Sequence, residues 1–352
     1  MVMQMRLYMF GMDGERPGEC ARKLKAKGVS VVVSPPDEKA AQALRDEGLD
    51  IWGCIGAFSM KDSDPEDWLS EDAFGEKRRW FGSGCPNERA LWERGFDQIS
   101  RWKSMGAKAV LADGARFASP CPGTELFLSC FCPRCMEKGA QMGYDMEKMR
   151  ESVQKWAKTP GMPLPEEWLR FREECTAAYF SEFARRVRAE GMECGSFVFA
   201  PSLGKIVGQT EKSTRGLDII APMLYRKYLP QPGIATLNDE YASLWRFYEA
   251  RGDADIAEQI EAECGTGMPG ENADGIWQNG FAPETIGTET AQAKAGYGGL
   301  TAPILQLDDD RLAQSIGSAA AAGADAIGFF MYNEEGMRKM PGLAEYHEGQ
   351  EG

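Results

Sequence analysis

Residues 109–135 read AVLADGARFASPCPGTELFLSCFCPRC, and this stretch decides how the rest of the chain is interpreted. Four apolar residues, Ala109 to Ala112, are followed abruptly by Asp113 and a polar, proline-containing loop. A continuous apolar run that stops in this way is typical of a buried parallel strand. Functional side chains of α/β folds lie at the carboxyl ends of such strands. The sequence therefore predicts a functional loop directly after Ala112.

Outward from this stretch, short apolar runs alternate with helical patterns along the chain. The runs are apolar throughout instead of alternating apolar and polar residues, which favours a parallel sheet. Eight strand and helix alternations predict an α/β fold, a (β/α)8 TIM barrel with long loops on the carboxyl-terminal face. The predicted strands are 7–12, 29–33, 49–58, 109–112, 194–200, 217–224, 301–307 and 326–331. The predicted helices are 17–27, 37–47, 88–105, 144–156, 166–190, 283–295 and 311–322, and residues 238–264 are rich in helix formers.

The 352 residues are long for one ordinary domain and suit a barrel of ~250 residues with insertions. We predict one barrel over residues 1–345. It carries a zinc-binding loop at about 114–165 and an inserted segment at about 226–282 on the active face. Residues 346–352 form a polar tail.

Composition excludes several classes of partner. The formal net charge is −14 and no basic stripe offsets it, which argues against nucleic acid and anionic membranes. No run approaches the ~18 apolar residues of a membrane span. The N-terminal residues resemble a first strand more than a signal peptide, so the expected compartment is the cytoplasm. The sequence leaves open whether the chain forms a homo-oligomer.

The histidine and cysteine content limits the kinds of catalytic and metal site that the chain can form. The single histidine, His347, lies in the polar tail. This excludes a His-based catalytic triad and argues against a His-ligated catalytic metal. The ten cysteines are expected to be reduced thiols in this compartment, with some of them acting as metal ligands.

Three of these cysteines, Cys130, Cys132 and Cys135, are close enough in the chain to bind one ion. A closed tetrahedral zinc site needs a fourth ligand. Cys85 is the first choice because the loops after strands three and four of a barrel are neighbours, and Cys121 is the alternative. Such a structural Zn²⁺ has no open position for water, so its role is to hold two loops together. The competing interpretation is a group of half-buried reduced thiols.

The cysteine spacing also resembles a known family. Cys85-Pro86-Asn87 followed by the run Cys130 to Cys135 is similar to the zinc cluster of glycoside hydrolase family 42 β-galactosidases. The resemblance covers residues 78–150 well and implies a barrel with zinc beside its mouth. It also implies catalytic carboxylates at the ends of strands four and seven. The family has an Asn-Glu pair at the end of strand four, whereas this chain has Asp113-Gly-Ala-Arg116.

Cleavage of a glycosidic bond needs two carboxyl groups that face each other across it. Asp113 ends predicted strand four and Asp308 ends predicted strand seven, on opposite sides of a barrel. We assign Asp113 as general acid/base and Asp308 as nucleophile or base. Mutual repulsion within the run Asp308 to Asp310 would raise the carboxyl pKa values. Asp310 is the expected N-cap of the next helix, and the alternative role of Asp113 is a turn cap.

Further side chains at predicted strand ends and in active-face loops are candidates for substrate binding. Arg116 is expected either to grip substrate or to form a salt bridge with a neighbouring loop. Glu334 is also the alternative nucleophile. Tryptophan rings pack on sugars, so Trp52 and Trp80 join Trp277 as candidate platforms. The substrate-binding set is Asp13, Arg116, Tyr225, Trp277, Asp309, Tyr332 and Glu334.

These patterns support three hypotheses of function. The first is a glycoside hydrolase that acts on an oligosaccharide or small glycoside through two carboxylates. The second is a sugar or sugar-acid lyase or isomerase that uses a mobile divalent metal bound by oxygen ligands such as Asp13, Asp308 and Asp309. The third is a non-catalytic barrel that binds glycans.

Overall fold

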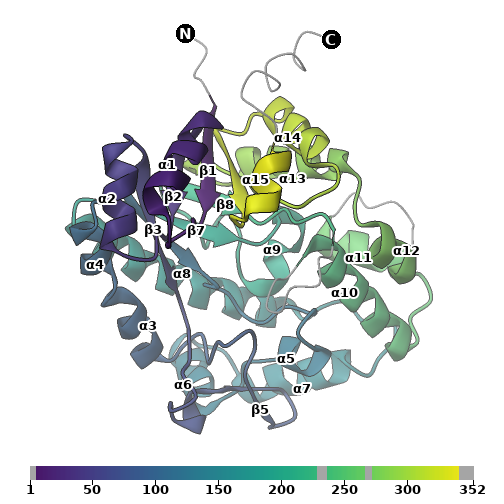
Figure 1. The fold of residues 1–352 in the computed structure, drawn as a ribbon. Coiled ribbons are helices and arrows are strands. Elements are labelled where there is room, and N and C mark those ends of the chain that lie inside the picture. Colours follow the sequence, from purple (N-terminus) through teal and green to yellow (C-terminus); the bar gives the residue numbers. More distant parts are fainter. Residues whose placement is uncertain (1–4, 228–235, 266–271, 341–352) are drawn as a thin grey trace.

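A computed structural model describes residues 5–227, 236–265 and 272–340 of the chain. In these ranges, nine strands form a curled sheet with the order β10-β11-β1-β2-β3-β6-β7-β8-β9, and every pairing is parallel. Figure 1 shows the strands at the centre of the molecule with helices around them. The strands are β1 (Arg6–Phe10), β2 (Val29–Val33), β3 (Asp50–Gly56), β6 (Ala109–Asp113), β7 (Glu193–Val198), β8 (Ile219–Pro222), β9 (Leu300–Thr301), β10 (Ile304–Gln306) and β11 (Ala326–Phe330).

Strands β9 and β10 together occupy the position of the predicted strand 301–307. Pro303 lies between them and has no N–H for the ladder, so the regular pairing is interrupted there. β9 pairs with β8, β10 pairs with β11, and a bridge joins Met223 to Ile304. The two strands at the ends of the sheet order are therefore only two residues apart in the chain. This curled α/β sheet is consistent with a TIM-like fold.

Helices in the connections between strands surround the sheet. The connections contain α1 (Pro17–Ala26), α2 (Glu38–Asp46), α3 (Arg89–Phe96), α4 (Ile99–Ser104), α8 (Glu166–Ala189), α9 (Pro201–Val207), α13 (Pro283–Gly296) and α14 (Leu312–Ala321). Long loops add η1 (Glu66–Trp68), β4 (Ser70–Glu71), β5 (Lys77–Arg78), α5 (Thr124–Phe127), α6 (Pro133–Gln141), α7 (Met146–Trp156), α10 (Leu237–Arg251), α11 (Ile256–Cys264), α12 (Ala273–Asn279) and α15 (Glu334–Lys339).

The apolar side chains form two clusters, one on each face of the sheet. The outer cluster packs strands against helices. The inner cluster takes side chains from strands all along the sheet order, as expected when a curled sheet encloses a packed interior. Its buried members are Tyr8, Val31, Val33, Trp52, Ala109, Leu111, Phe197, Ile219, Ala221, Tyr225, Ala302, Ile304 and Ala326.

One long helical prediction is wrong. The predicted helix 88–105 is two helices, α3 and α4, and the segment 238–264, which is rich in helix formers, contains α10 and α11 with a break between them. Gly252 ends α10 in the left-handed conformation, with φ of 86°, which glycine adopts at little cost. The predicted tail 346–352, with His347, lies outside the described residues. So do 228–235 and 266–271 within the predicted insertion.

Candidate active site and metal centre

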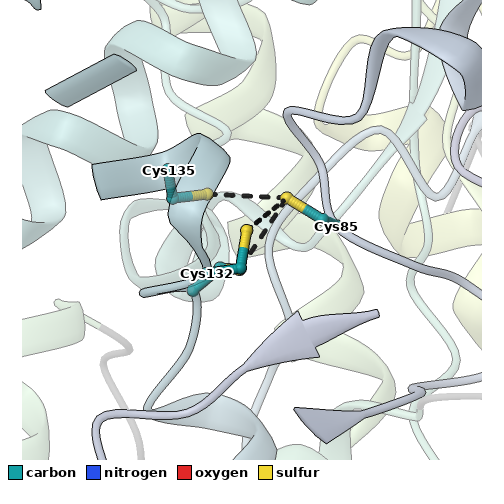
Figure 2. Close-up of side chains that lie close together, drawn as sticks. Cys85, Cys132 and Cys135 are labelled. Carbon is teal, nitrogen blue, oxygen red and sulfur yellow. Dashed lines mark hydrogen bonds between the residues drawn. The ribbon is translucent and has the colours of Figure 1, made fainter. Parts of the chain in front are cut away.

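Four cysteines lie together beside the sheet. Cys85 follows the β4–β5 hairpin, Cys130 and Cys132 precede α6, and Cys135 lies in its first turn. All four are buried, and their sulfur atoms lie within 4.8 Å of one another. Figure 2 shows Cys132 and Cys135 pointing toward Cys85, at Sγ–Sγ distances of 3.4 and 3.5 Å. Cys130 Sγ lies 3.8 Å from Cys85 Sγ.

This arrangement, which we call the cysteine group, fits one metal ion. The sulfur distances are too long for a disulfide, at ~2.05 Å, and all four cysteines are free. Zinc–sulfur bonds of ~2.3 Å in a tetrahedron place the sulfur atoms about 3.8 Å apart. Cys85, the predicted fourth ligand, lies with the three other cysteines. The alternative, Cys121, donates instead to Asp239 Oδ2 at 2.7 Å.

Neighbouring N–H groups point at the sulfur atoms. Backbone N–H groups of Asn87 and Glu71 donate to Cys85 and Cys130. The side-chain amide of Asn87 donates to Cys135 Sγ at 3.2 Å. Such donors are typical of the shell around metal-bound thiolates. Sequence reasoning noted the Cys-Pro-Asn tripeptide but assigned no role to Asn87.

The thiols of the cysteine group have pKa shifts in opposite directions. Hydrogen bonds from Cys130 and its neighbours lower the pKa of Cys132. A hydrogen bond with Cys130 raises the pKa of Cys85, and burial raises that of Cys135. The protein alone therefore does not hold four thiolates together, because buried like charges repel one another. A bound cation removes that conflict.

Asp113 ends β6 on the inner face of the sheet. Ala109 and Leu111, two and four residues earlier, belong to the inner cluster, and side chains two residues apart share one face of a strand. Asp113 is exposed to solvent, but neighbouring protein atoms crowd its carboxyl and raise the carboxyl pKa, which Arg116 partly lowers. The direction of this shift favours the protonated acid.

Tyr225 lies within electrostatic range of the same carboxyl. Burial raises the pKa of Tyr225, and the negative charge of Asp113 raises it further. Burial and Asp113 act on the Cys54 thiol in the same way. The Tyr225 ring packs 5.4 Å from that of Phe330, at the end of β11. The structure thus brings predicted site residues Asp113 and Tyr225 together.

Arg116 is buried three residues beyond Asp113, with 4% of its surface exposed. Its guanidinium lies 4.8 Å from the ring of Trp80 and 4.3 Å from that of Phe199. Its Nη1 donates to the Phe117 carbonyl, and its Nε is buried without a hydrogen-bond partner among the described residues. Burial lowers its pKa, and the charges of Glu240 and Asp113 raise it. A salt bridge from Arg116, the alternative prediction, is absent from the described residues.

Glu240 is a candidate that sequence reasoning missed. It lies in α10, is 2% exposed, and accepts hydrogen bonds from Ser119 Oγ at 2.6 Å and from the Cys121 N–H at 3.0 Å. Burial raises its pKa to about 7, against the lowering effects of Arg116 and these hydrogen bonds. The signal was its spacing: Glu240 lies three residues after Leu237 and four before Leu244, on the apolar face of the helix.

The three aspartates after β10 have different environments. Asp308 is exposed and accepts from Asn333 Nδ2 at 3.1 and 3.2 Å. Asp309 is buried and bonds through both oxygens to Arg226, at 2.5 and 2.8 Å. Asp309 also accepts from the Arg311 N–H at the start of α14. The prediction of Asp310 as the N-cap is wrong: Arg311 is the N-cap residue of α14, no side chain caps the helix, and Asp310 pairs with Arg226 instead.

Asp13, Tyr332 and Glu334 are brought to one rim of the sheet next to β1. Asp13 accepts from the N–H and Nε of Arg16, and the backbone hydrogen bonds lower its pKa. Tyr332 donates to Glu334 Oε1 at 2.9 Å, and Lys23 Nζ lies 3.1 Å from the same oxygen. These carboxylates therefore already have local cationic partners.

The predicted tryptophan platforms differ in exposure. Trp52 and Trp80 are only 2% and 1% exposed, so neither presents a ring face to a sugar in solution. Trp52 packs 5.2 Å from Tyr8 in the inner cluster. Trp277, in α12, is half-buried, and the Arg246 guanidinium lies 5.4 Å from its ring.

Sequence comparisons identify no relative, because no protein-family model and no curated protein matches the chain. Solved structures do match. The chain is similar to a β-galactosidase from the Antarctic haloarchaeon Halorubrum lacusprofundi, with a TM-score of 0.57 and 14% identity over 97% of this chain and 54% of that one. The chain also matches a β-galactosidase from the psychrophilic Marinomonas ef1, with a TM-score of 0.58 and 11% identity. This match covers 98% of this chain and 58% of that one. The catalytic domain of a β-amylase from Paenibacillus polymyxa matches with a TM-score of 0.51 and 11% identity. This match covers 94% of this chain and 92% of that one.

Identities this low show a shared fold alone. The chain spans little more than half the length of the two β-galactosidases. Within the described ranges, no helix combines the length and apolar character needed to cross a bilayer.

Proposed function

We propose that this protein is a glycoside hydrolase in which Asp113 acts as general acid/base. The observation that carries the proposal is the position of the Asp113 carboxyl, which is open to solvent on the inner face at the end of β6 and has its pKa raised by the protein atoms around it. A glycosidase acid must hold a proton near its working pH in order to protonate the leaving oxygen. The β-galactosidase and β-amylase folds of the structural neighbours support this class.

In this proposal Asp308 is the second carboxylate, acting as nucleophile or as base toward water. It follows β10, is open to solvent, and is oriented by Asn333. If the curled sheet closes as a (β/α)8 barrel, β6 and β10 are strands four and seven, which face each other across the interior. Arg116 and Tyr225 beside Asp113 are the nearest candidates for substrate contacts, with Trp277 as the candidate sugar platform.

We further propose that the cysteine group binds structural Zn²⁺, as in the family 42 cluster that the Cys85 and 130–135 spacing resembles. Four thiolates leave no open coordination position, so the ion would stabilise the loops and take no part in bond cleavage. Metal analysis of the purified protein is expected to find one zinc per chain. Its removal by a chelator is expected to lower the melting temperature, and added Mg²⁺ would not reverse that.

The experiment that tests the catalytic assignment compares Asp113→Asn and Asp308→Asn on a panel of aryl glycosides. Each substitution keeps the side-chain shape and removes the ionisable proton. General acid/base catalysis contributes about 10²–10⁴-fold, so each variant is expected to lose at least 10²-fold in kcat/KM. Asp97→Asn, at the exposed C-cap of α3, is the control for the substitution itself. Retention of activity by both site variants would remove the two aspartates from the chemistry.

The two other functions are distinguishable outcomes of the same measurements. Saturable sugar binding without turnover would identify a glycan-binding barrel. Activity lost on chelation and restored by Mg²⁺ or Mn²⁺ would identify a metal-dependent lyase or isomerase. The contacts argue against the latter, since Asp13 is bonded to Arg16 and Asp309 to Arg226. The cysteine group is the one set of three or more potential ligands found among the described residues.

A further inference from the structure

Arg172, in the second turn of α8, is a fully buried cation. Its side chain has no solvent exposure, and its guanidinium stacks 3.7 Å from the ring centre of Trp168. Most buried arginines pair with a carboxylate, because an isolated charge inside a protein is strongly unfavourable. No carboxylate forms an ion pair with Arg172 in the described part of the chain. Its hydrogen bonds go to backbone carbonyls instead.

Two of these carbonyls lie within three residues of Cys130, and the other two lie in α9 and in the loop after β6. Both Phe127 and Ser129 accept from Nη2, and the Ser129 carbonyl belongs to the peptide bond that leads into Cys130. Nη1 donates to the carbonyl of Ile206 at 2.6 Å and to that of Ala118 at 3.5 Å. Neutral carbonyls stabilise the guanidinium by their dipoles but leave its net charge uncompensated.

Other contacts of α8 also reach the cysteine group. One turn after Arg172, Cys175 Sγ accepts from the Asn87 side chain at 3.3 Å, and the same amide donates to Cys135 Sγ. Arg172 and the four thiols are therefore parts of one buried region.

The charge balance of this region indicates which group compensates the charge of Arg172. Four thiolates around a divalent ion carry a net charge of −2, which is itself costly to bury. The positive charge of Arg172 is opposite in sign and lies in the same buried region, so each charge lowers the cost of burying the other.

We propose that Arg172 is the internal counter-charge of the metal centre and a determinant of its metal affinity. This inference rests on the zinc site of the proposed function and is independent of the glycosidase assignment. Arg172 acts without contacting the side chain of a metal ligand. It acts through the electrostatic attraction of its charge and through its hydrogen bond to the carbonyl that precedes Cys130.

The test measures Zn²⁺ affinity by competition with a chromophoric chelator at fixed pH, with melting temperature recorded separately. Asn87, whose side chain donates to Cys135 Sγ, also lines an open hollow of about 800 Å³. Loss of a group just outside the ligands typically weakens metal binding 10–100-fold. Arg172→Met is expected to weaken Zn²⁺ binding by that factor. Arg172→Lys, which keeps the charge but loses the forked hydrogen bonds, is expected to recover most of the affinity.

A matched control separates charge from packing. Arg251 is equally buried, stacks on Trp156 and pairs with Asp253. Arg251→Met is expected to lower the melting temperature and to leave zinc affinity within about threefold of wild type. Arg172→Gln, whose amide still donates to the carbonyls, replaces Arg172→Met if the latter does not fold, with the same expected loss of affinity.

The outcomes identify which proposal fails. Wild-type protein that binds no Zn²⁺ would overturn the zinc site and the role of Arg172 with it, and would leave the Asp113 assignment standing. If the wild type binds Zn²⁺ and the neutral Arg172 variants bind it with the same affinity, the counter-charge role of Arg172 alone is overturned. If Arg172→Lys and the neutral variants lose the same amount of Zn²⁺ affinity, Arg172 acts through packing and not through its charge.

Discussion

The buried carboxyl of Glu240 makes stability depend on pH, and Glu240→Gln should remove that dependence. Folding raises its pKa from 4.5 to about 7 through burial. The folded state therefore binds the proton more tightly than the unfolded state. The resulting stabilisation is fully present below about pH 4.5 and is lost as the pH rises through about 7. The two pKa values correspond to about 3 kcal/mol, of which about 2.5 kcal/mol falls between pH 5 and pH 8.

Equilibrium unfolding in urea at pH 5 and pH 8 measures this contribution. Glutamine keeps an oxygen that accepts from Ser119 and Cys121, and it does not ionise. We compare the unfolding free energy of Glu240→Gln with that of the wild type at each pH. This difference is expected to shift by about 2.5 kcal/mol in favour of the variant's folded state between pH 5 and pH 8. Glu151→Gln, exposed on α7, serves as the control. An equal wild-type–variant difference at the two pH values would refute a buried, proton-retaining Glu240.

Two packing predictions can be checked by the same urea experiment. Arg226→Met is expected to lower the unfolding free energy by about 3–5 kcal/mol, because it leaves the buried Asp309 without its partner; a loss below about 1 kcal/mol would contradict the ion pair. Gly328→Ala would place a Cβ 2.0 Å from Tyr8 Cζ in the inner cluster and is expected to cost about 1–3 kcal/mol. Gly317→Ala, in α14 with no atom within 4 Å of the new Cβ, is the control and should stabilise the protein by up to ~1 kcal/mol.

The sequence predicted the strands better than the helices, and burial explains the difference. Buried parallel strands are apolar throughout, so β2 and β6 were located within a residue. Helix boundaries depend on local signals that were given too little weight. Gly252 ends α10 inside a segment of helix formers, while α6 and α9 begin at Pro133 and Pro201 in stretches that the sequence presents as loops.

The candidate site was predicted where the chemistry is local. Few arrangements other than metal binding explain thiols as close in sequence as Cys130, Cys132 and Cys135, and a barrel makes Cys85 their neighbour. Glu240, Arg172 and Arg226 could not be assigned in this way. Each looks like an ordinary charged residue in or beside a helical pattern, and its role arises from loops distant in the sequence. A charged residue on the apolar face of a helix is the signal that sequence reasoning should use.

The cysteine group and Asp113 are connected through buried guanidinium groups. Arg172 holds the carbonyl before Cys130 and that of Ala118, in the loop that follows Asp113. Arg116, in the same loop, bonds to the carbonyl of Phe117. If the metal fixes the Cys130 side of this connection, its removal should loosen the β6 loop as well. Amide hydrogen exchange is therefore expected to accelerate across residues 114–131 after chelation, while β2 stays protected. Acceleration confined to 130–135 would show that the metal holds only its own loop.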